Sequence, residues 1–197
     1  MARPRTHTAE LRERIMACAL DTVAEHGLAA LALRDVAERA GTSTAAVYAL
    51  FGSKEALHRA VLISAFADFG AEQAAQETSE DPVTDLAGLG ARYVQWALDH
   101  PRLYEAMFAD SAAGLASSPD LDRARRQAIG GVSDAVRRAL ASGAFRPADE
   151  ATVVASLWAQ VHGLAALMTA GQLPAEADPA AAAWAVIEGW LAPPDTT

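Results

Sequence analysis

A short stretch rich in hydroxyl groups is the first candidate for chemistry in this sequence. Thr42, Ser43 and Thr44 stand together, followed by Ala45 and, one helical turn after Thr44, by Tyr48. Side chains this small let a backbone come close to a ligand. Hydroxyl groups can hydrogen-bond phosphate oxygens, and a tyrosine ring can also reach a thymine methyl. The stretch therefore favours contact with nucleic acid, although a Ser/Thr cluster before a helix is often only an N-cap.

Residue types used in catalysis and metal binding form no comparable pattern. The chain has five histidines, one cysteine and 25 acidic residues. Their spacing gives no paired-histidine metal motif, no phosphate-cradling glycine loop and no nucleophile elbow. Asp99 and His100 are adjacent, which does not by itself make an acid–base pair. We therefore expect no enzyme activity, no metal site and no cofactor.

Charge is distributed unevenly along the 197 residues, whose formal net charge is −9. Residues 1–60 contain eight basic and seven acidic side chains, whereas the remainder contains eight basic and 18 acidic ones. Only the N-terminal part is therefore suited to approach a polyanion. We expect Arg3 and Arg5 to add a flexible basic arm to it.

The elements that must position the hydroxyl stretch are predicted to be helices. Apolar residues recur at helical spacing over residues 8–26, 33–40 and about 44–50. Gly41 is placed to end the second of these helices, and Ser43 to cap the third. Two short helices joined by a tight glycine-containing turn and backed by a longer helix form a helix-turn-helix. In that motif the last helix protrudes and can enter a major groove by its N-terminal end.

The rest of the chain is also predicted to be helical. Sustained two-residue alternation does not occur, and only 13 Gly and 9 Pro are present, so a turn-dense β fold is disfavoured. Six further helices are expected, over residues 54–76, 85–100, 101–108, 119–141, 149–170 and 179–191. Residues 109–118 are expected to form a loop. The prediction is an all-α protein of about nine helices, with a DNA-binding domain over residues 1–53 and a ligand-binding and dimerisation domain over residues 54–197.

One uncharged run, from Ala151 to Ala175, is long enough to cross a bilayer. It contains Gln160 and His162, however, and acidic residues rather than Lys or Arg flank it. We interpret it as a buried helix or a subunit interface, with no membrane partner. The single cysteine and the absence of an apolar signal region at the N-terminus are consistent with a cytoplasmic protein.

The eighth predicted helix is apolar on most of its faces. Its apolar residues are Val153, Val154, Leu157, Trp158, Val161, Leu164, Leu167 and Met168. One chain does not easily cover all of these faces, whereas a two-fold-related partner can. We therefore predict a homodimer through the eighth and ninth helices; the alternative is that the chain's own helices cover these residues.

Aromatic and methionine side chains accompanied by one or two polar groups suit a small, mostly apolar ligand. The predicted ligand-binding residues of this kind are Trp96, His100, Tyr104, Met107, Phe108, Trp158 and His162. For each of them the alternative is ordinary packing. For His162, next to Gly163, the alternative is a structural hydrogen bond.

Two sets of residues resemble a known family. The ordered set Ala-Gly-x-Ser at residues 40–43, Tyr48, Phe51 and Lys-Glu-x-Leu at residues 54–57 resembles the N-terminal domain of the TetR family of transcriptional repressors, over about residues 8–60. The spacing Trp-x-x-x-His-Gly at residues 158–163 is similar to one type of TetR C-terminal domain. The resemblance implies an all-α homodimer that binds a double-stranded DNA operator and represses transcription until a small ligand binds.

By position, the resemblance and the turn pattern together assign the DNA contacts. The predicted DNA-binding residues are Arg34, Thr42, Ser43, Thr44, Ala45, Tyr48 and Lys54. The chain departs from the family at Ala32, where Ser or Thr is usual, and at Ala49 and Leu50, where a basic or histidine pair is common. Both departures remove polar contacts, so we expect modest affinity. The competing interpretation is an all-α protein-interaction module that does not bind DNA.

Overall fold

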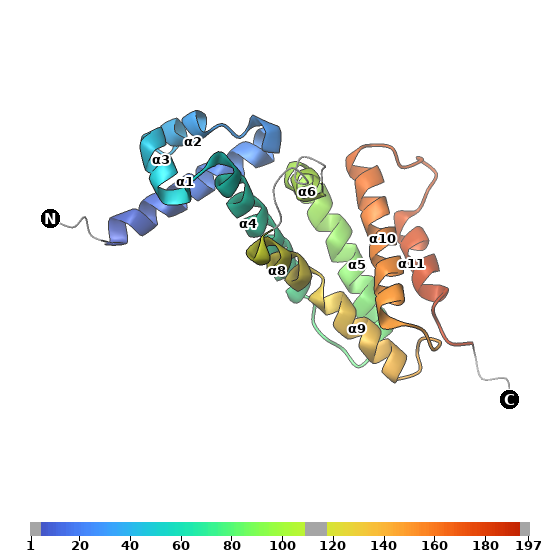
Figure 1. Ribbon diagram of the computed structural model, residues 1–197. Helices are drawn as coiled ribbons and strands as arrows, with labels where there is room; N and C mark the ends of the chain where they lie inside the picture. Colours follow the sequence, from blue (N-terminus) through green and yellow to red (C-terminus); the bar gives the residue numbers. More distant parts are fainter. Residues whose placement is uncertain (1–4, 109–117, 194–197) are drawn as a thin grey trace. The chain divides into compact units, whose positions relative to one another are not determined.

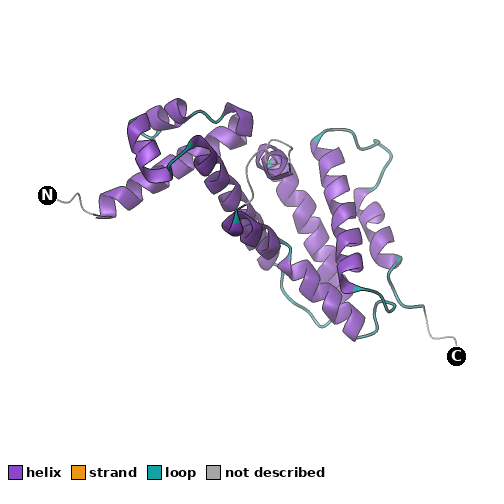
Figure 2. Ribbon diagram, viewed as in Figure 1, coloured by secondary structure: helices purple, strands orange, loops and turns teal. Residues whose placement is uncertain are grey.

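The computed structural model describes residues 5–108 and 118–193, and within them helices form nearly all of the regular structure (Figures 1 and 2). The described ranges contain ten α-helices, one short 3-10 helix (η1, Leu28–Ala30) and no strand beyond an isolated bridge between Phe145 and Leu191. The all-α fold is thereby confirmed. The helices are α1 (Arg5–His26), α2 (Leu33–Arg39), α3 (Thr44–Phe51), α4 (Lys54–Ala74), α5 (Pro82–Asp99), α6 (Pro101–Phe108), α8 (Pro119–Ala128), α9 (Gly130–Ala141), α10 (Glu150–Thr169) and α11 (Pro179–Glu188).

The chain divides into two compact units. The first consists of Met1–Phe66 and His100–Arg125, and the second of Ala67–Asp99 and Arg126–Thr197. This division follows packing, and α4 contributes its first part to one unit and its last part to the other. The functional boundary that the sequence places at residue 53 stays a prediction.

The first unit is built around side chains that are fully withdrawn from water. Ile15 of α1, Val36 of α2 and Val47 of α3 each have no exposed surface, and neither do Leu57 and Val61 of α4. These residues are the apolar positions that recur at helical spacing in the sequence. Their burial holds α2 and α3 against the longer α1.

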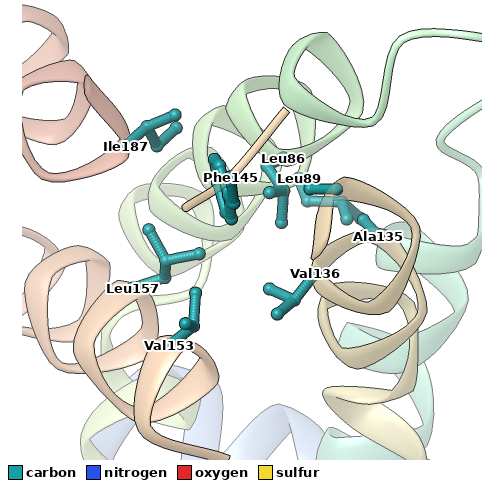
Figure 3. Close-up of a cluster of buried hydrophobic side chains, with 9 residues drawn as sticks. Leu86, Leu89, Ala135, Val136, Phe145, Val153, Leu157 and Ile187 are labelled. Atoms are coloured by element: carbon teal, nitrogen blue, oxygen red, sulfur yellow. The ribbon is translucent and has the colours of Figure 1, made fainter. Parts of the chain in front are cut away.

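The second unit has a separate core where α5, α9, α10 and α11 pack together. In Figure 3, Leu86 and Leu89 of α5 face Val136 of α9 and Leu157 of α10, with Phe145 among them. Phe145 lies between helices and is only 1% exposed. An aromatic residue from a connection thus fills the centre of this unit.

Several helix boundaries differ from those predicted. α1 begins at Arg5, three residues before the predicted start at residue 8, so Arg5 belongs to a helix and the prediction that it forms part of a flexible arm is wrong. The next difference concerns α5. This helix begins at Pro82, three residues earlier than expected. Asp81 ends the loop because its carboxylate accepts hydrogen bonds from the Val83 N–H at 2.9 Å and from the Thr84 hydroxyl at 2.6 Å. Proline is favoured in the first turn of a helix, where its missing N–H costs nothing.

The helix predicted over residues 119–141 is two helices. It is broken at Ile129, whose φ and ψ of −108° and 6° are not helical. Gly130 and Gly131 follow directly, and glycine has a low helix propensity because it loses the most backbone entropy on folding. The apolar pattern continued across the break and therefore concealed it.

The last helix ends at Glu188, so Trp190 and Leu191 lie beyond it. Competing tertiary contacts account for the early end. The Trp190 carbonyl accepts from the Arg146 N–H at 2.9 Å, and the guanidinium of Arg146 stacks over the Trp190 ring at 4.3 Å. Most of the loop expected over residues 109–118, and Arg3 of the expected basic arm, lie outside the described residues.

Candidate nucleic-acid interface and ligand cavity

The turn between α2 and α3 has the geometry that the sequence predicts. Gly41 adopts φ +63°, a left-handed conformation that glycine reaches without steric cost. Ser43 is extended, and its hydroxyl accepts a hydrogen bond from the Ala46 N–H at 3.2 Å, so the predicted N-cap is confirmed. The turn thus starts α3 at Thr44, immediately after the hydroxyl stretch.

α3 has one buried face and one exposed face. Val47 and Phe51 pack inward, whereas Thr44, Ala45 and Tyr48 are exposed. Tyr48 keeps 52% of its surface in contact with water, an unusual degree of exposure for a large aromatic residue. The predicted contact residues of this helix therefore share its free face.

The remaining predicted DNA-binding residues stand at helix starts around this face. Arg34, in the first turn of α2, and Lys54, the first residue of α4, are exposed. Thr42 is half-buried in the turn, and Ser43 is exposed although its hydroxyl caps α3. The segment from Gly41 to Ser53 contains no charged residue, so few cations are available to meet phosphates.

Two arginines outside the predicted set of functional residues stabilise this unit. Arg12 of α1 donates to the Leu50 carbonyl at 2.8 Å, and its guanidinium lies over the Phe51 ring at 4.3 Å, which fixes the C-terminal end of α3. Arg39 of α2 donates to Thr22 and pairs with Glu25, both on α1. No sequence signal identifies such partners, because they lie 14 to 38 residues away in the chain.

His58 ties α4 to the segment before α2. Its Nε2 lies 3.4 Å from the Leu31 carbonyl. Burial lowers the pKa of His58 below its usual value, because a charged imidazole loses hydration there. His58 is therefore neutral at pH 7 and serves packing in this unit.

The second unit contains a cavity of about 650 Å³. It is lined by apolar residues of α5, α9, α10 and α11, with Phe69 and Gln73 from the end of α4. Leu86, Leu89 and Ile187, which belong to the core in Figure 3, also line it. The volume lies within the range of about 300–1,000 Å³ that is usual for small-molecule sites.

Two polar side chains of the cavity wall are buried. Gln73 is 6% exposed and, in the orientation that satisfies both amide atoms, donates to the Leu89 carbonyl and accepts from the Tyr93 N–H, each at 3.2 Å. Tyr93 is 4% exposed, and its hydroxyl lies 3.1 Å from Nδ1 of His162. Burial lowers the pKa of His162, so this imidazole is neutral at pH 7.

The predicted ligand-binding residues are divided between the units. Of the seven, Trp158 lines the cavity, and His162 reaches the wall through Tyr93. Trp96 instead packs against Phe69, with the ring centroids 5.3 Å apart, and donates to Asp68 at 2.9 Å.

The other four predicted ligand residues belong to the first unit. These residues are His100, Tyr104, Met107 and Phe108. Tyr104 and Phe108 pack against each other at 5.0 Å, and Met107 is fully buried. The ligand role of all seven residues stays a prediction. Gln73 and the aliphatic residues of α5 that line the cavity were not predicted, because their spacing does not differ from that of ordinary core residues.

α10 and α11 also expose large apolar side chains. Trp158, Leu167 and Trp184 keep 38%, 40% and 42% of their surfaces in contact with water. By length and composition α10 is apolar enough to cross a membrane. It nevertheless packs on α5, α9 and α11, and Gln160 donates from it to the Ala182 carbonyl at 3.1 Å. These contacts are those of a helix in a folded bundle.

Comparison with known proteins identifies the same two regions. Residues 15–61 match the family described as bacterial regulatory proteins, tetR family, and residues 86–189 match the family described as tetracyclin repressor-like, C-terminal domain. The second match covers more than half of the chain.

Individual relatives agree with the family matches. The HTH-type transcriptional repressor KstR2 of Mycolicibacterium smegmatis is 31% identical over 145 residues, which cover 71% of this chain and 69% of that protein. The HTH-type transcriptional regulator Mb1846 of Mycobacterium bovis is 28% identical over 64% of this chain, but the match spans only 56% of its length. A solved structure of a Rhodococcus protein of unknown function superposes with a TM-score of 0.80 at 26% identity, over 92% of this chain and 95% of the other.

Proposed function

Because the chain belongs to the TetR family of bacterial transcriptional regulators, we propose that it is a ligand-responsive repressor that binds a palindromic operator as a homodimer. The observation that carries this proposal is the free face of α3, where Thr44, Ala45 and Tyr48 are exposed at the start of a helix fixed by buried residues. A rigid, protruding helix with small and hydroxyl-bearing residues is suited to a major groove. We also propose that the protein is cytoplasmic and is not an enzyme.

In the proposed complex each subunit places one α3 in a major groove. The two half-sites then lie one helical turn, about 34–36 Å, or a multiple of it, apart. Tyr48 and Thr44 contact phosphates or groove edges, and Arg34 and Lys54 contact the phosphate backbone. Only two basic side chains of each subunit, Arg34 and Lys54, contact phosphates in this complex. The DNA affinity therefore decreases only gradually as the salt concentration rises.

The proposed dimer forms through α10 and α11. Leu167 and Trp184 are large apolar residues left exposed by the chain's own packing, and exposed apolar surface of this kind marks an association site. A two-fold axis pairs the same patch on both subunits. A dimer also brings together the two copies of α3 that a palindrome requires.

The proposed switch acts through α4. The first part of this helix supplies Leu57 and Val61 to the core of the DNA-binding unit, and its last part supplies Phe69 and Gln73 to the cavity wall. A ligand that displaces the end of α4 therefore acts on a helix that also packs in the unit containing α3. By linkage, ligand and operator weaken each other's binding by the same factor.

A mobility-shift assay on DNA upstream of the chain's own gene, together with selection from genomic fragments, tests operator binding. We expect a specific shift that Tyr48→Ala reduces about tenfold or more, in line with the loss of one good base or backbone contact. Tyr48→Phe separates the hydroxyl from the ring. Absence of a specific complex in both assays would contradict the proposal.

A matched pair of charge-removing variants controls for electrostatics. Lys54→Gln removes a cation next to the proposed interface, and Arg126→Gln removes an exposed cation of the second unit. We expect the first to weaken DNA binding and to flatten its salt dependence, and the second to change neither. Equal effects would indicate non-specific attraction.

The alternative, an all-α protein-interaction module, predicts no retention on DNA at any salt concentration. Retention that is lost as salt rises therefore distinguishes the two functions. For the dimer, sedimentation at micromolar concentration is expected to give twice the chain mass, and Leu167→Glu is expected to give monomers. A monomeric parent protein would contradict the proposed assembly.

A further inference from the structure

The cavity of the second unit has a chemical character that narrows the ligand. Among its described lining residues are no lysine, arginine or histidine, and Asp178 is the single charged one. We propose that the cavity is selective for uncharged, largely apolar molecules that carry one or two hydrogen-bonding groups, and that it excludes acids and phosphate esters. This proposal rests on the proposed function of the cavity and specifies the class of its ligand.

Asp178 does not provide a site for a cationic ligand. Its carboxylate accepts the N–H groups of Ala180 and Ala181, at 2.9 and 3.1 Å, and so caps α11. A carboxylate at a helix N-terminus is already stabilised by the positive end of the helix dipole. A ligand cation would have to compete with that cap, whereas a ligand anion would meet like charge.

Most of the neutral polar groups of the lining are also engaged with the protein. Gln160 donates to the Ala182 carbonyl, and Gln95 donates to Asp99 at 2.9 Å. Gln73 and Tyr93 are the buried polar residues of the described lining, and both are uncharged. Gln73 has hydrogen-bonding capacity beyond the two bonds described above, because an amide has two N–H groups and two acceptor lone pairs.

The described lining offers no cation to pair with a negatively charged ligand, and this disfavours binding of anions. A carboxylate or sulfonate that enters an apolar cavity loses its hydration and gains no cation in return, so its burial is strongly disfavoured. A neutral hydroxyl or carbonyl loses less and can recover a hydrogen bond at Gln73. Selectivity against anions therefore arises from the whole wall rather than from one residue.

The neutral dye N-phenyl-1-naphthylamine and its sulfonated analogue 8-anilino-1-naphthalenesulfonate test this proposal, because they share a skeleton and differ by one negative charge. We expect the purified full-length protein to bind the neutral dye at least about tenfold more tightly, as expected for an unpaired buried polar group. Val94→Trp, which fills part of the lining from α5, is expected to weaken binding of the neutral dye. Equal or tighter binding of the sulfonate to the parent protein would overturn the proposal.

Adding one cation to the wall provides the decisive variant. Val132→Lys of α9 is expected to raise the affinity for the sulfonate about tenfold and to leave the neutral dye within about twofold. Ala141→Lys, an equal charge change at an exposed residue of the same helix that does not line the cavity, is the matched control and is expected to change neither dye.

A second variant that adds a cation keeps the test valid if Val132→Lys fails to fold. Gln95 is exposed and lines the cavity, so Gln95→Lys adds a positive charge to the wall without disturbing the core. If neither lysine in the wall changes the preference, the proposal is wrong. Operator binding by the ligand-free protein is measured separately, so failure of the ligand class and failure of DNA binding are distinguished.

Discussion

The exposed residues of α3 are small or hydroxyl-bearing, whereas α10 and α11 expose two tryptophans and a leucine among smaller residues. In the first unit the apolar side chains are withdrawn into a filled core, and the free face offers polar atoms to a ligand. In the second unit a buried core lies beside a cavity, and apolar surface remains exposed. This contrast is the basis of the two proposals above, in which the first unit presents a helix to DNA and the second binds an apolar ligand and a second copy of the chain.

The largest expected effect is on the core of the second unit. Phe145→Ala removes a fully buried aromatic ring from the cluster in Figure 3 and is expected to lower the free energy of unfolding by about 4 kcal/mol. Chemical denaturation followed by circular dichroism measures this loss. Phe145→Leu is the control and should recover much of the stability, because it restores most of the volume. A small loss for the alanine variant would mean that this core collapses around the gap.

The next effect concerns an ion pair of the second unit. Arg138 donates to the buried carboxylate of Asp85, which also accepts from Ser79. The bond to Arg138 lowers the pKa of Asp85, so its stabilising contribution is complete above the unfolded value of about 3.9 and is lost as the pH falls below it. Arg138→Ala is expected to cost about 2 kcal/mol at pH 7, since it leaves a buried charge without its partner.

The neighbouring Arg137 is the matched control for that variant. Its ion pairs with Asp134 and Glu150 are exposed, so Arg137→Ala should change the unfolding free energy little. Unfolding measured between pH 7 and pH 3 should show the two arginine variants converging as Asp85 is protonated. Equal losses at neutral pH would contradict the distinction between buried and exposed pairs.

In the first unit we expect a smaller effect, from loss of the cap of α3. Ser43→Ala removes the acceptor for the Ala46 N–H and should destabilise the protein by about 1 kcal/mol. Thr44→Ala, at the next position, should leave stability unchanged and weaken only operator binding. Thermal unfolding and mobility shift on both variants separate the two roles. If Thr44→Ala destabilised the protein and Ser43→Ala did not, Thr44 rather than Ser43 would be the N-cap of α3.

The smallest effect compares one histidine from each unit. Burial lowers the folded pKa of both His58 and His162, so the unfolded chain binds more protons as the pH falls below about 6.5. Stability should therefore be highest above that pH and decline below it. His58→Gln and His162→Gln should each flatten the decline in thermal midpoint between pH 7 and pH 5. An unchanged decline in both variants would place its origin elsewhere.

The local features of the α2–α3 turn and of α3 could be predicted from the pattern of neighbouring residues in the sequence. The glycine at residue 41, the cap at Ser43 and the buried position of Val47 each follow from a rule that acts within one or two helical turns. The break at Ile129 and the early end of α11 could not be predicted in this way. In the first case the apolar spacing continued across two glycines, and in the second the contacts with Arg146 prevailed over local helix preference.

The sequence by itself determined the all-α class, the helix-turn-helix and the residues of its free face, because helix periodicity, capping and charge are properties of neighbouring residues. Only the tertiary structure decided that Phe145 fills the second core, that Gln73 and Tyr93 line a cavity, and that Arg12 fixes the end of α3. These arrangements join residues tens of positions apart. Their side chains are indistinguishable, in the chain, from ordinary core or surface until packing brings them together.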